Sequence, residues 1–241
     1  MINSIFKRIL LKIYNFGYFL YPSHLGVPEP NIPLIVKTLE GQFSGGILLD
    51  IGSCSAPYKR YFDKFKLHYL CMDIIANPEY KIDIIADICH TSVKESSVIL
   101  VTLFQVLEHL HSPKEALKEC YRILKPQGFL IITAPQYWHI HRWPGDYYRY
   151  TDEGIRYLCQ EAGFQVYKIW PMGGPGILIS LVIVNNFDLN GDPLRRVFLA
   201  VPLTWFCLFL DKIFFKNNIK RKNPDTTGWV IIARKNEDIN D

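Results

Sequence analysis

The residues best suited to chemistry lie in a short stretch where one acid precedes several small side chains. Asp50 ends an apolar run, and residues 51–56 (IGSCSA) follow it. Small residues let the backbone approach a ligand, and a helix N-terminus after such a turn favours a carboxylate or phosphate. Asp73 and Asp87 follow the next two apolar runs. If these runs are parallel strands, the three acids lie at one edge of a sheet, where open α/β sheets bind ligands.

Apolar runs typical of buried strands alternate with helical patterns along the middle of the chain. The expected strands are 47–51, 69–72, 82–86, 98–103, 129–133, 164–170 and 228–233, and the expected helices are 112–124 and 151–162. Thr151 is the expected N-cap of the second helix, and residues 125–128 (KPQG) are expected to end the first. This alternation predicts a doubly wound, mostly parallel α/β sheet that is covered on both faces.

Two parts of the chain depart from that plan. More than fifty residues separate the last two expected strands, and they include the apolar segments 177–184 and 197–215, both predicted to be helices. We therefore expect a helical insert at about 173–223 within a domain that spans 35–235. Residues 1–34 are predicted to form an N-terminal amphipathic helix and a Pro-rich linker, because apolar residues recur at three- and four-residue spacing up to Leu20.

Several segments resemble the class I S-adenosylmethionine-dependent methyltransferases, of the kind labelled methyltransferase type 11. The resemblance covers about residues 45–170 and the last strand. It rests on LLDIGSCSAPY (48–58), the acids in CMDI (71–74) and IIADI (84–88), and FQVLEHLHSPKEALKECYRILKPQGFLIITAP (104–135). It implies a Rossmann-like methyltransferase fold, S-adenosyl-L-methionine as the methyl donor and S-adenosyl-L-homocysteine as the product.

The resemblance also implies a set of cofactor-binding residues. Asp50, Gly52, Ser53 and Cys54 are expected at the methionine end, Asp73 at the ribose, Asp87 and Ile88 at the adenine, and Gln105 and Val106 beside the sulfonium. Ile74, next to Asp73, is a further expected cofactor-binding residue. The family normally has Gly where Cys54 stands, and a positive φ would cost Cys54 about 1 kcal/mol. The alternative is therefore a non-catalytic methyltransferase-fold partner protein with weakened cofactor binding. A nicotinamide oxidoreductase is a third hypothesis, disfavoured because the turn lacks GxGxxG.

Methyl transfer from a sulfonium is a direct in-line displacement, so a base is needed only if the acceptor loses a proton. The candidate catalytic residues are His109, His139, His141 and Asp146. His109 has the alternative role of packing or capping its helix, and residues 139–150 that of a loop held by aromatic packing and an Arg–Asp pair. The two H-x-H pairs suggest a metal, but no acid cluster accompanies them, so no metal site is predicted.

The composition bears on the partners. Six cysteines without a CxxC pair are typical of reduced thiols, which predicts a cytoplasmic protein. Basic, aromatic and aliphatic residues mix between 195 and 222, which predicts peripheral contact with the inner face of a membrane and a small-molecule, sugar or lipid-linked acceptor. The alternative is a core, a substrate lid or a homodimer interface through 177–222. No nucleic-acid partner is expected, because the basic residues lie among bulky apolar groups.

Overall fold

The computed structural model describes residues 31–142, 144–189, 192–214 and 224–236. Contacts divide the chain into two compact units. Of the described residues, the sheet unit contains 31–136, 140–142, 144–170 and 228–236, and the helical unit contains 137–139, 171–189, 192–214 and 224–227. The predicted N-terminal amphipathic helix and most of the predicted linker lie outside the described residues.

The sheet unit is built on seven strands in the order β3-β2-β1-β4-β5-β7-β6. The strands are β1 (Ile47–Ile51), β2 (His68–Asp73), β3 (Ile84–Ile85), β4 (Val98–Phe104), β5 (Leu124–Pro135), β6 (Gln165–Met172) and β7 (Gly228–Arg234). The pairings β1–β2, β1–β4, β2–β3 and β4–β5 are parallel, whereas β7 runs antiparallel to β5. The predicted doubly wound, mostly parallel sheet is therefore confirmed.

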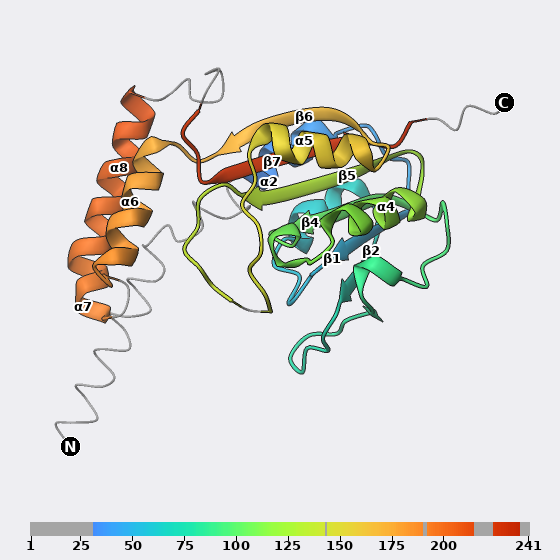
Figure 1. Cartoon of the computed structure of the whole chain (residues 1–241), viewed down its shortest axis with the longest axis horizontal. Helices are drawn as coiled ribbons and strands as arrows, with labels where there is room; N and C mark the ends of the chain where they lie inside the picture. The colour runs from blue at the N-terminus through green and yellow to red at the C-terminus, as the bar shows by residue number, and fades with distance from the viewer. Residues whose placement is uncertain (1–30, 143, 190–191, 215–223, 237–241) are drawn as a thin grey trace. The chain divides into compact units, whose positions relative to one another are not determined.

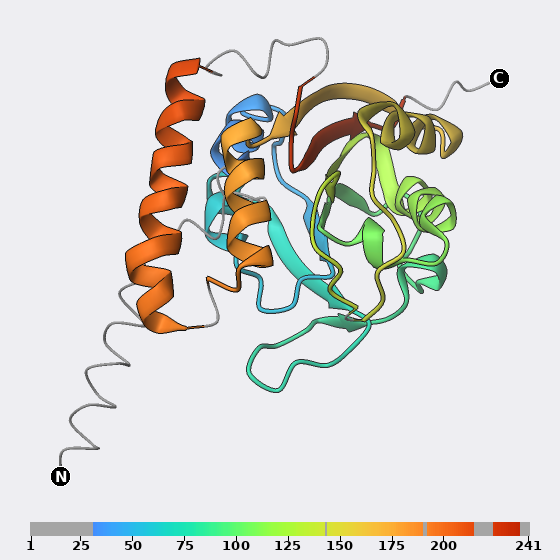
Figure 2. The same ribbon diagram turned by 60° about the vertical axis from the view of Figure 1, so that its left-hand side comes forward.

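Helices cover both faces of this sheet (Figures 1 and 2). They are α2 (Ile32–Thr38), the four-residue α3 (Lys59–Phe62), α4 (Pro113–Ile123) and α5 (Asp152–Glu161). In both views α4 and α5 lie on one face and α2 and α3 on the other. The buried side of α4, formed by Ala116, Leu117 and Cys120, packs in the same apolar cluster as Val101 and Ile132 of the central strands. This core fixes the strand ends that carry the candidate site.

Strands β1 and β4 are neighbours, although β2 and β3 lie between them in the sequence. The chain therefore runs outward from β1 in one direction and from β4 in the other. In a doubly wound sheet, the crevice outside the carboxyl ends of two such strands is where ligands bind. The segments that follow Ile51 and Phe104 both enter this crevice.

The helical unit contains α6 (Pro175–Asn186), α7 (Pro193–Arg195), a π-helical turn (Arg196–Ala200) and α8 (Val201–Phe214). Small residues let α6 and α8 approach closely: a Cβ added at Gly176 would lie 2.4 Å from the Cys207 carbonyl oxygen. Ser180 and Thr204 share a hydrogen bond of 2.7 Å. Asp211 of α8 accepts hydrogen bonds from the first backbone N–H groups of α6, at Gly176 and Ile177. Among the described residues, no helix is long and apolar enough to span a membrane.

Several element boundaries differ from the predicted ones. Helix α2 begins at Ile32 with a proline in its first turn, so the predicted linker ends earlier than Pro33. Helix α4 ends at Ile123, and residues 125–128, which were predicted to lie between helix and strand, already belong to β5, where the register with β4 shifts. Strand β3 is shorter than the predicted 82–86. The predicted helix 197–215 is instead a π-helical turn followed by α8.

Candidate active site at the carboxyl edge of the sheet

A cavity of about 680 Å³ lies in the sheet unit at the carboxyl ends of the strands. Ligand pockets for small molecules commonly have volumes of about 300–1,000 Å³. Eight of the ten predicted cofactor-binding residues line its wall: Gly52, Cys54, Asp73, Ile74, Asp87, Ile88, Gln105 and Val106. The structure therefore brings side chains from four separate segments to one space. Asp50 and Ser53 are not on the cavity wall.

The turn after β1 has a backbone conformation that glycine favours. Gly52 has φ +67°, and a Cβ at this position would lie 2.6 Å from Val106 Cγ2, so no larger residue fits. Cys54 has φ +49°, a left-handed conformation that costs a residue with a Cβ about 1 kcal/mol. The thiol is solvent-exposed, and Cys54 lies on the wall of a cavity that remains open. The helix that follows, α3, is too short for its N-terminus to serve as the predicted anion site.

The carboxylate of Asp73 at the end of β2 holds this turn in place. Its Oδ2 accepts a hydrogen bond of 3.0 Å from the backbone N–H of Cys54, and its Oδ1 accepts one of 2.8 Å from Ile74 N. Asp87 uses its Oδ1 in the same way, as the cap that accepts from Cys89 N. Each carboxylate oxygen has two lone-pair sites, so these acids retain capacity to accept from a ligand in the cavity.

Asp50 is not part of the cavity wall but binds neighbouring side chains beneath it. Its side chain is buried beneath the turn, where Oδ1 accepts a hydrogen bond of 2.6 Å from Thr102 Oγ1 and Oδ2 accepts one of 2.5 Å from the Tyr69 hydroxyl. Burial raises the pKa of Asp50 to about 6, although these two hydrogen bonds act in the opposite direction. The predicted meeting of three acids in one pocket therefore holds for Asp73 and Asp87 only.

A tight turn after β4 forms the other side of the cavity. Gln105 has φ +55°, and its backbone N–H donates to Thr133 Oγ1 at 3.1 Å. Backbone conformations of this kind are concentrated at functional sites. Val106 then leads into a 3₁₀ helix, Leu107–His109, so that one run of five residues supplies the cavity wall at Gln105, Val106 and His109.

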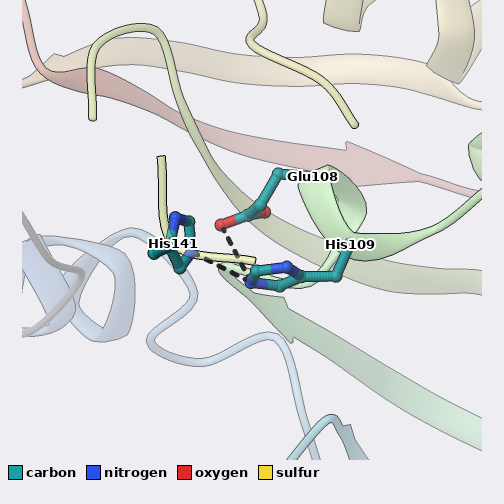
Figure 3. Close-up of side chains that lie close together, drawn as sticks. All are labelled: Glu108, His109 and His141. Atoms are coloured by element: carbon teal, nitrogen blue, oxygen red, sulfur yellow. Dashed lines mark hydrogen bonds and ion pairs between the residues drawn. The ribbon is translucent and has the colours of Figure 1, made fainter. Parts of the chain in front are cut away.

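The loop between β5 and α5 folds back onto this turn. The backbone N–H of Tyr147 donates to the Glu108 carbonyl at 2.8 Å, and the Tyr150 hydroxyl donates to the Leu107 carbonyl at 2.9 Å. The loop thereby brings the imidazole of His141 to that of His109, with 3.3 Å between their Nε2 atoms. Figure 3 shows Glu108 beside the two rings.

The other predicted catalytic residues have different surroundings. Asp146 is buried and bound by Arg149, whose hydrogen bonds hold the pKa of Asp146 well below its usual range. This is the Arg–Asp pair that the alternative interpretation of the loop predicted. His139 belongs to the helical unit, where its Nδ1 lies 3.2 Å from Asn185 Nδ2.

Glu108 also belongs to the group of side chains at His109 and His141, and no role was predicted for it from the sequence. Its side chain is buried, and burial raises its pKa to about 7. Burial also lowers the pKa of His109 below its usual value, which leaves the imidazole neutral at pH 7. His111 and Tyr147 also line the cavity and were not predicted. The sequence LEHLH contained a signal for Glu108, because it places an acid directly beside an H-x-H pair.

Comparisons with known proteins agree with this geometry. Residues 49–132, about a third of the chain, match the family model described as a methyltransferase domain. A search of curated proteins found no significant match.

Three solved structures illustrate the fold. The Burkholderia thailandensis 1,6-didemethyltoxoflavin-N1-methyltransferase is 11% identical, with a TM-score of 0.55 over 98% of this chain and 89% of its own. Haemonchus contortus phosphoethanolamine N-methyltransferase 2, in complex with S-adenosyl-L-methionine, is 16% identical, with a TM-score of 0.54 over 87% of this chain and 53% of its own. The [4+2]-cyclase SpnF is 15% identical, with a TM-score of 0.53 over 85% of this chain and 81% of its own.

The cyclase shows that likeness at this level establishes the fold and not the reaction. The reaction class is indicated by the match of residues 49–132, which spans the turn after β1, the acids that follow β2 and β3, and the turn after β4. The resemblance found in the sequence is confirmed over residues 49–132, which match a methyltransferase domain, within a fold that is shared with S-adenosylmethionine-dependent methyltransferases.

Proposed function

We propose that the protein transfers a methyl group from S-adenosyl-L-methionine to a small-molecule, sugar or lipid-linked acceptor. The observation that carries the proposal is the single cavity lined by the turn after β1, Asp73, Asp87 and the turn after β4. These segments are separate in the sequence, and a purely structural role would not require all of them to face one space.

The cavity wall offers a suitable group to each part of the cofactor. Asp73 lies where a carboxylate would accept the two ribose hydroxyls, as an acid after the second strand does in dinucleotide-binding folds. Ile74 and Ile88 offer apolar surface to the adenine ring, next to Asp87. Gly52 and Cys54 would lie along the methionine portion, with Gln105 and Val106 beside the sulfonium.

Methyl transfer from S-adenosyl-L-methionine depends mainly on how the protein positions the two reactants. The methyl group is already activated by the positive sulfur, so the protein must hold acceptor, methyl and sulfur in line and exclude water. An acceptor that carries a proton also needs a base. His109 lines the cavity and its lowered pKa keeps it unprotonated at pH 7, so it is the proposed proton acceptor, with His141 beside it.

Isothermal titration calorimetry with S-adenosyl-L-homocysteine tests the cofactor site. We expect one site per chain, and Asp73→Asn should weaken binding at least tenfold, because the neutral amide is a poorer acceptor for two ribose hydroxyls. Asp83→Asn is the matched control: Asp83 also accepts a backbone hydrogen bond, from Cys71 N, but is not on the cavity wall. If the wild-type protein binds neither this product nor S-adenosyl-L-methionine, the non-catalytic alternative replaces our proposal.

The helical unit suggests the class of acceptor. On α8, Thr204 and Cys207 face α6, whereas Trp205, Phe206 and Phe209 are exposed, each by more than half. Exposed aromatic side chains on one helix face, followed by the basic sequence KNNIKRK (216–222), are typical of a helix at the surface of an anionic bilayer. We therefore propose that the protein meets membranes peripherally and methylates a lipid-linked or other amphiphilic acceptor.

Vesicle co-sedimentation tests this second part. We expect binding to vesicles with anionic lipid that decreases with added salt, and a loss of binding in the double variant Trp205→Ser, Phe209→Ser. Tyr157→Ser, which removes an exposed aromatic side chain from α5, is the control. If the wild-type protein does not bind the vesicles but forms a dimer, and the double variant is monomeric, the exposed face of α8 is a homodimer interface instead.

A further inference from the structure

Three side chains beside the cavity form a cluster with the composition of a metal site. Glu108 and His109 extend from the 3₁₀ turn after β4, and His141 faces them from the loop after β5 (Figure 3). One ligand atom from each lies within 4.8 Å of the other two. His109 Nε2 is 3.3 Å from His141 Nε2 and 3.9 Å from Glu108 Oε1. Ligands about 2.1 Å from a shared metal ion have separations of this order.

The hydrogen bonds of the two rings indicate which nitrogens face the cluster. His109 Nδ1 contacts the carbonyl oxygen of Gly145, which can only accept, so this nitrogen carries the proton. His141 Nδ1 lies 3.4 Å from Asp146 Oδ2, and Asp146 is itself fixed by Arg149. Histidine ligands of metals usually donate their other N–H to just such a carbonyl or carboxylate.

With Nδ1 of each ring turned to its own acceptor, the two Nε2 atoms face each other and the Glu108 carboxylate. Neither oxygen of Glu108 has a hydrogen-bond partner among the described residues, and the side chain is only 1% exposed. A buried carboxylate without partners is costly, and buried charges in proteins are normally paired or bound to metals. A cation placed among the three groups would satisfy all of them at once.

We propose that Glu108, His109 and His141 bind one divalent transition-metal ion through a carboxylate oxygen and two Nε2 atoms. Two imidazoles and one carboxylate are a ligand set of zinc, iron and related ions. His109 also lines the cavity, so an ion bound by this cluster would lie at the edge of the cavity. No metal was predicted from the sequence, because no acid cluster accompanies the H-x-H pairs; in the structure the single acid Glu108 joins one histidine of each pair.

The metal site indicates which functional group of the acceptor is methylated, and this step rests on the proposed function. An ion with open positions binds a hydroxyl oxygen and lowers its pKa, as bound water shows. With the ion on Nε2 and the Gly145 carbonyl on Nδ1, His109 no longer accepts a proton, so in the metal-bound protein the hydroxyl proton passes to solvent and not to His109. The oxygen then forms a bond to the methyl carbon while the carbon–sulfur bond breaks, and that electron pair remains on the sulfur of S-adenosyl-L-homocysteine. The acceptor class is therefore a hydroxyl compound, and the product is a methyl ether.

Metal binding is measured on the full-length protein, first by equilibrium dialysis against Zn²⁺ after treatment with a chelator. We expect one ion per chain, and at least a tenfold loss of affinity in Glu108→Gln and in His141→Gln. His111→Gln is the matched control, because His111 lies two residues after His109, beyond the 3₁₀ turn and outside the cluster, and the change should leave zinc affinity unchanged. The visible spectrum of the Co²⁺ form should lack thiolate charge-transfer bands, which excludes binding by the free cysteines.

Calorimetry with S-adenosyl-L-homocysteine on the same variants separates this inference from the proposed function. Glu108→Gln should retain product affinity within about threefold, which also shows that the variant is folded. Wild-type protein that binds the product but no Zn²⁺ or Co²⁺ would overturn the metal site and leave the methyltransferase intact. Equal metal affinity in all the variants would also overturn it, because the ion would then lie elsewhere.

Discussion

Asp50 offers the sharpest test of how this site is built, because its carboxyl group is buried beneath the cavity and not in its wall. Thr102 and Tyr69 each donate one hydrogen bond to it, and only 2% of the residue is exposed. Burial raises its pKa from 3.8 to about 6. The variant Asp50→Asn keeps the shape of the side chain and removes its titration.

The shift sets the size and the sign of the expected effect. A difference of about 2 pKa units corresponds to about 3 kcal/mol between the folded and unfolded states. Because the pKa of Asp50 is raised on folding, its contribution to stability is fully present below pH 3.8 and is lost as the pH rises through about 6. Between these values the folded state holds a proton that the unfolded state has released. The wild-type protein should therefore lose stability relative to Asp50→Asn as the pH rises.

Urea unfolding of the wild type and Asp50→Asn at pH 4 and pH 7.5 gives the difference in stability between the two proteins at each pH. The contributions of most other titrating groups are the same in both proteins and drop out of this difference. We expect the free energy of unfolding of the wild type, relative to Asp50→Asn, to fall by about 2–3 kcal/mol across this range. The variant should also bind S-adenosyl-L-homocysteine more tightly than Asp73→Asn does. A difference that stays constant within about 0.5 kcal/mol would refute the reasoning, because Asp50 would then titrate like a solvated acid.

Two further variants test the cavity and the frame that supports it. Gly52→Ala places a methyl group 2.6 Å from Val106 Cγ2, at a residue with φ +67°. Calorimetry should show at least a tenfold loss of affinity for S-adenosyl-L-homocysteine, which a second change, Val106→Ala, should partly restore. Unchanged affinity in Gly52→Ala would contradict the close approach of Gly52 to Val106. Thr151→Ala removes the N-cap hydroxyl that accepts a hydrogen bond of 3.0 Å from Gly154 N. The free energy of unfolding, measured with urea, should fall by about 1 kcal/mol. Thr151→Ser should retain most of the wild-type stability, and an equal loss in both variants would argue against capping.

The sequence predicted best where local patterns decide the outcome. Thr151 followed by acidic residues predicted the start of α5, and the structure has this cap. Small residues after Asp50 predicted a tight turn, and both Gly52 and Cys54 have positive φ. These features depend on backbone conformation within a few residues, so they are readable from the chain without its neighbours.

The predictions that failed depended on three-dimensional contacts. The burial of Asp50 follows from Thr102, a residue of β4 that lies 52 positions away. The approach of His141 to His109 depends on a loop whose backbone hydrogen bonds to the turn at Glu108. Spacing along the chain contains no information on either contact. The sequence LEHLH does place Glu108 beside an H-x-H pair, but only the approach of His141 shows that the three side chains form one cluster.

The run from Gln105 to His109 reaches from the part of the cavity wall proposed to face the sulfonium to the cluster of Glu108, His109 and His141. If both proposals hold, one short, hydrogen-bonded segment would contact the methyl donor and the acceptor alike, so a shift of either ligand should be transmitted to the other. An inhibitor designer could exploit this with a single rigid molecule that carries an adenosyl group at one end and a chelating oxygen pair at the other.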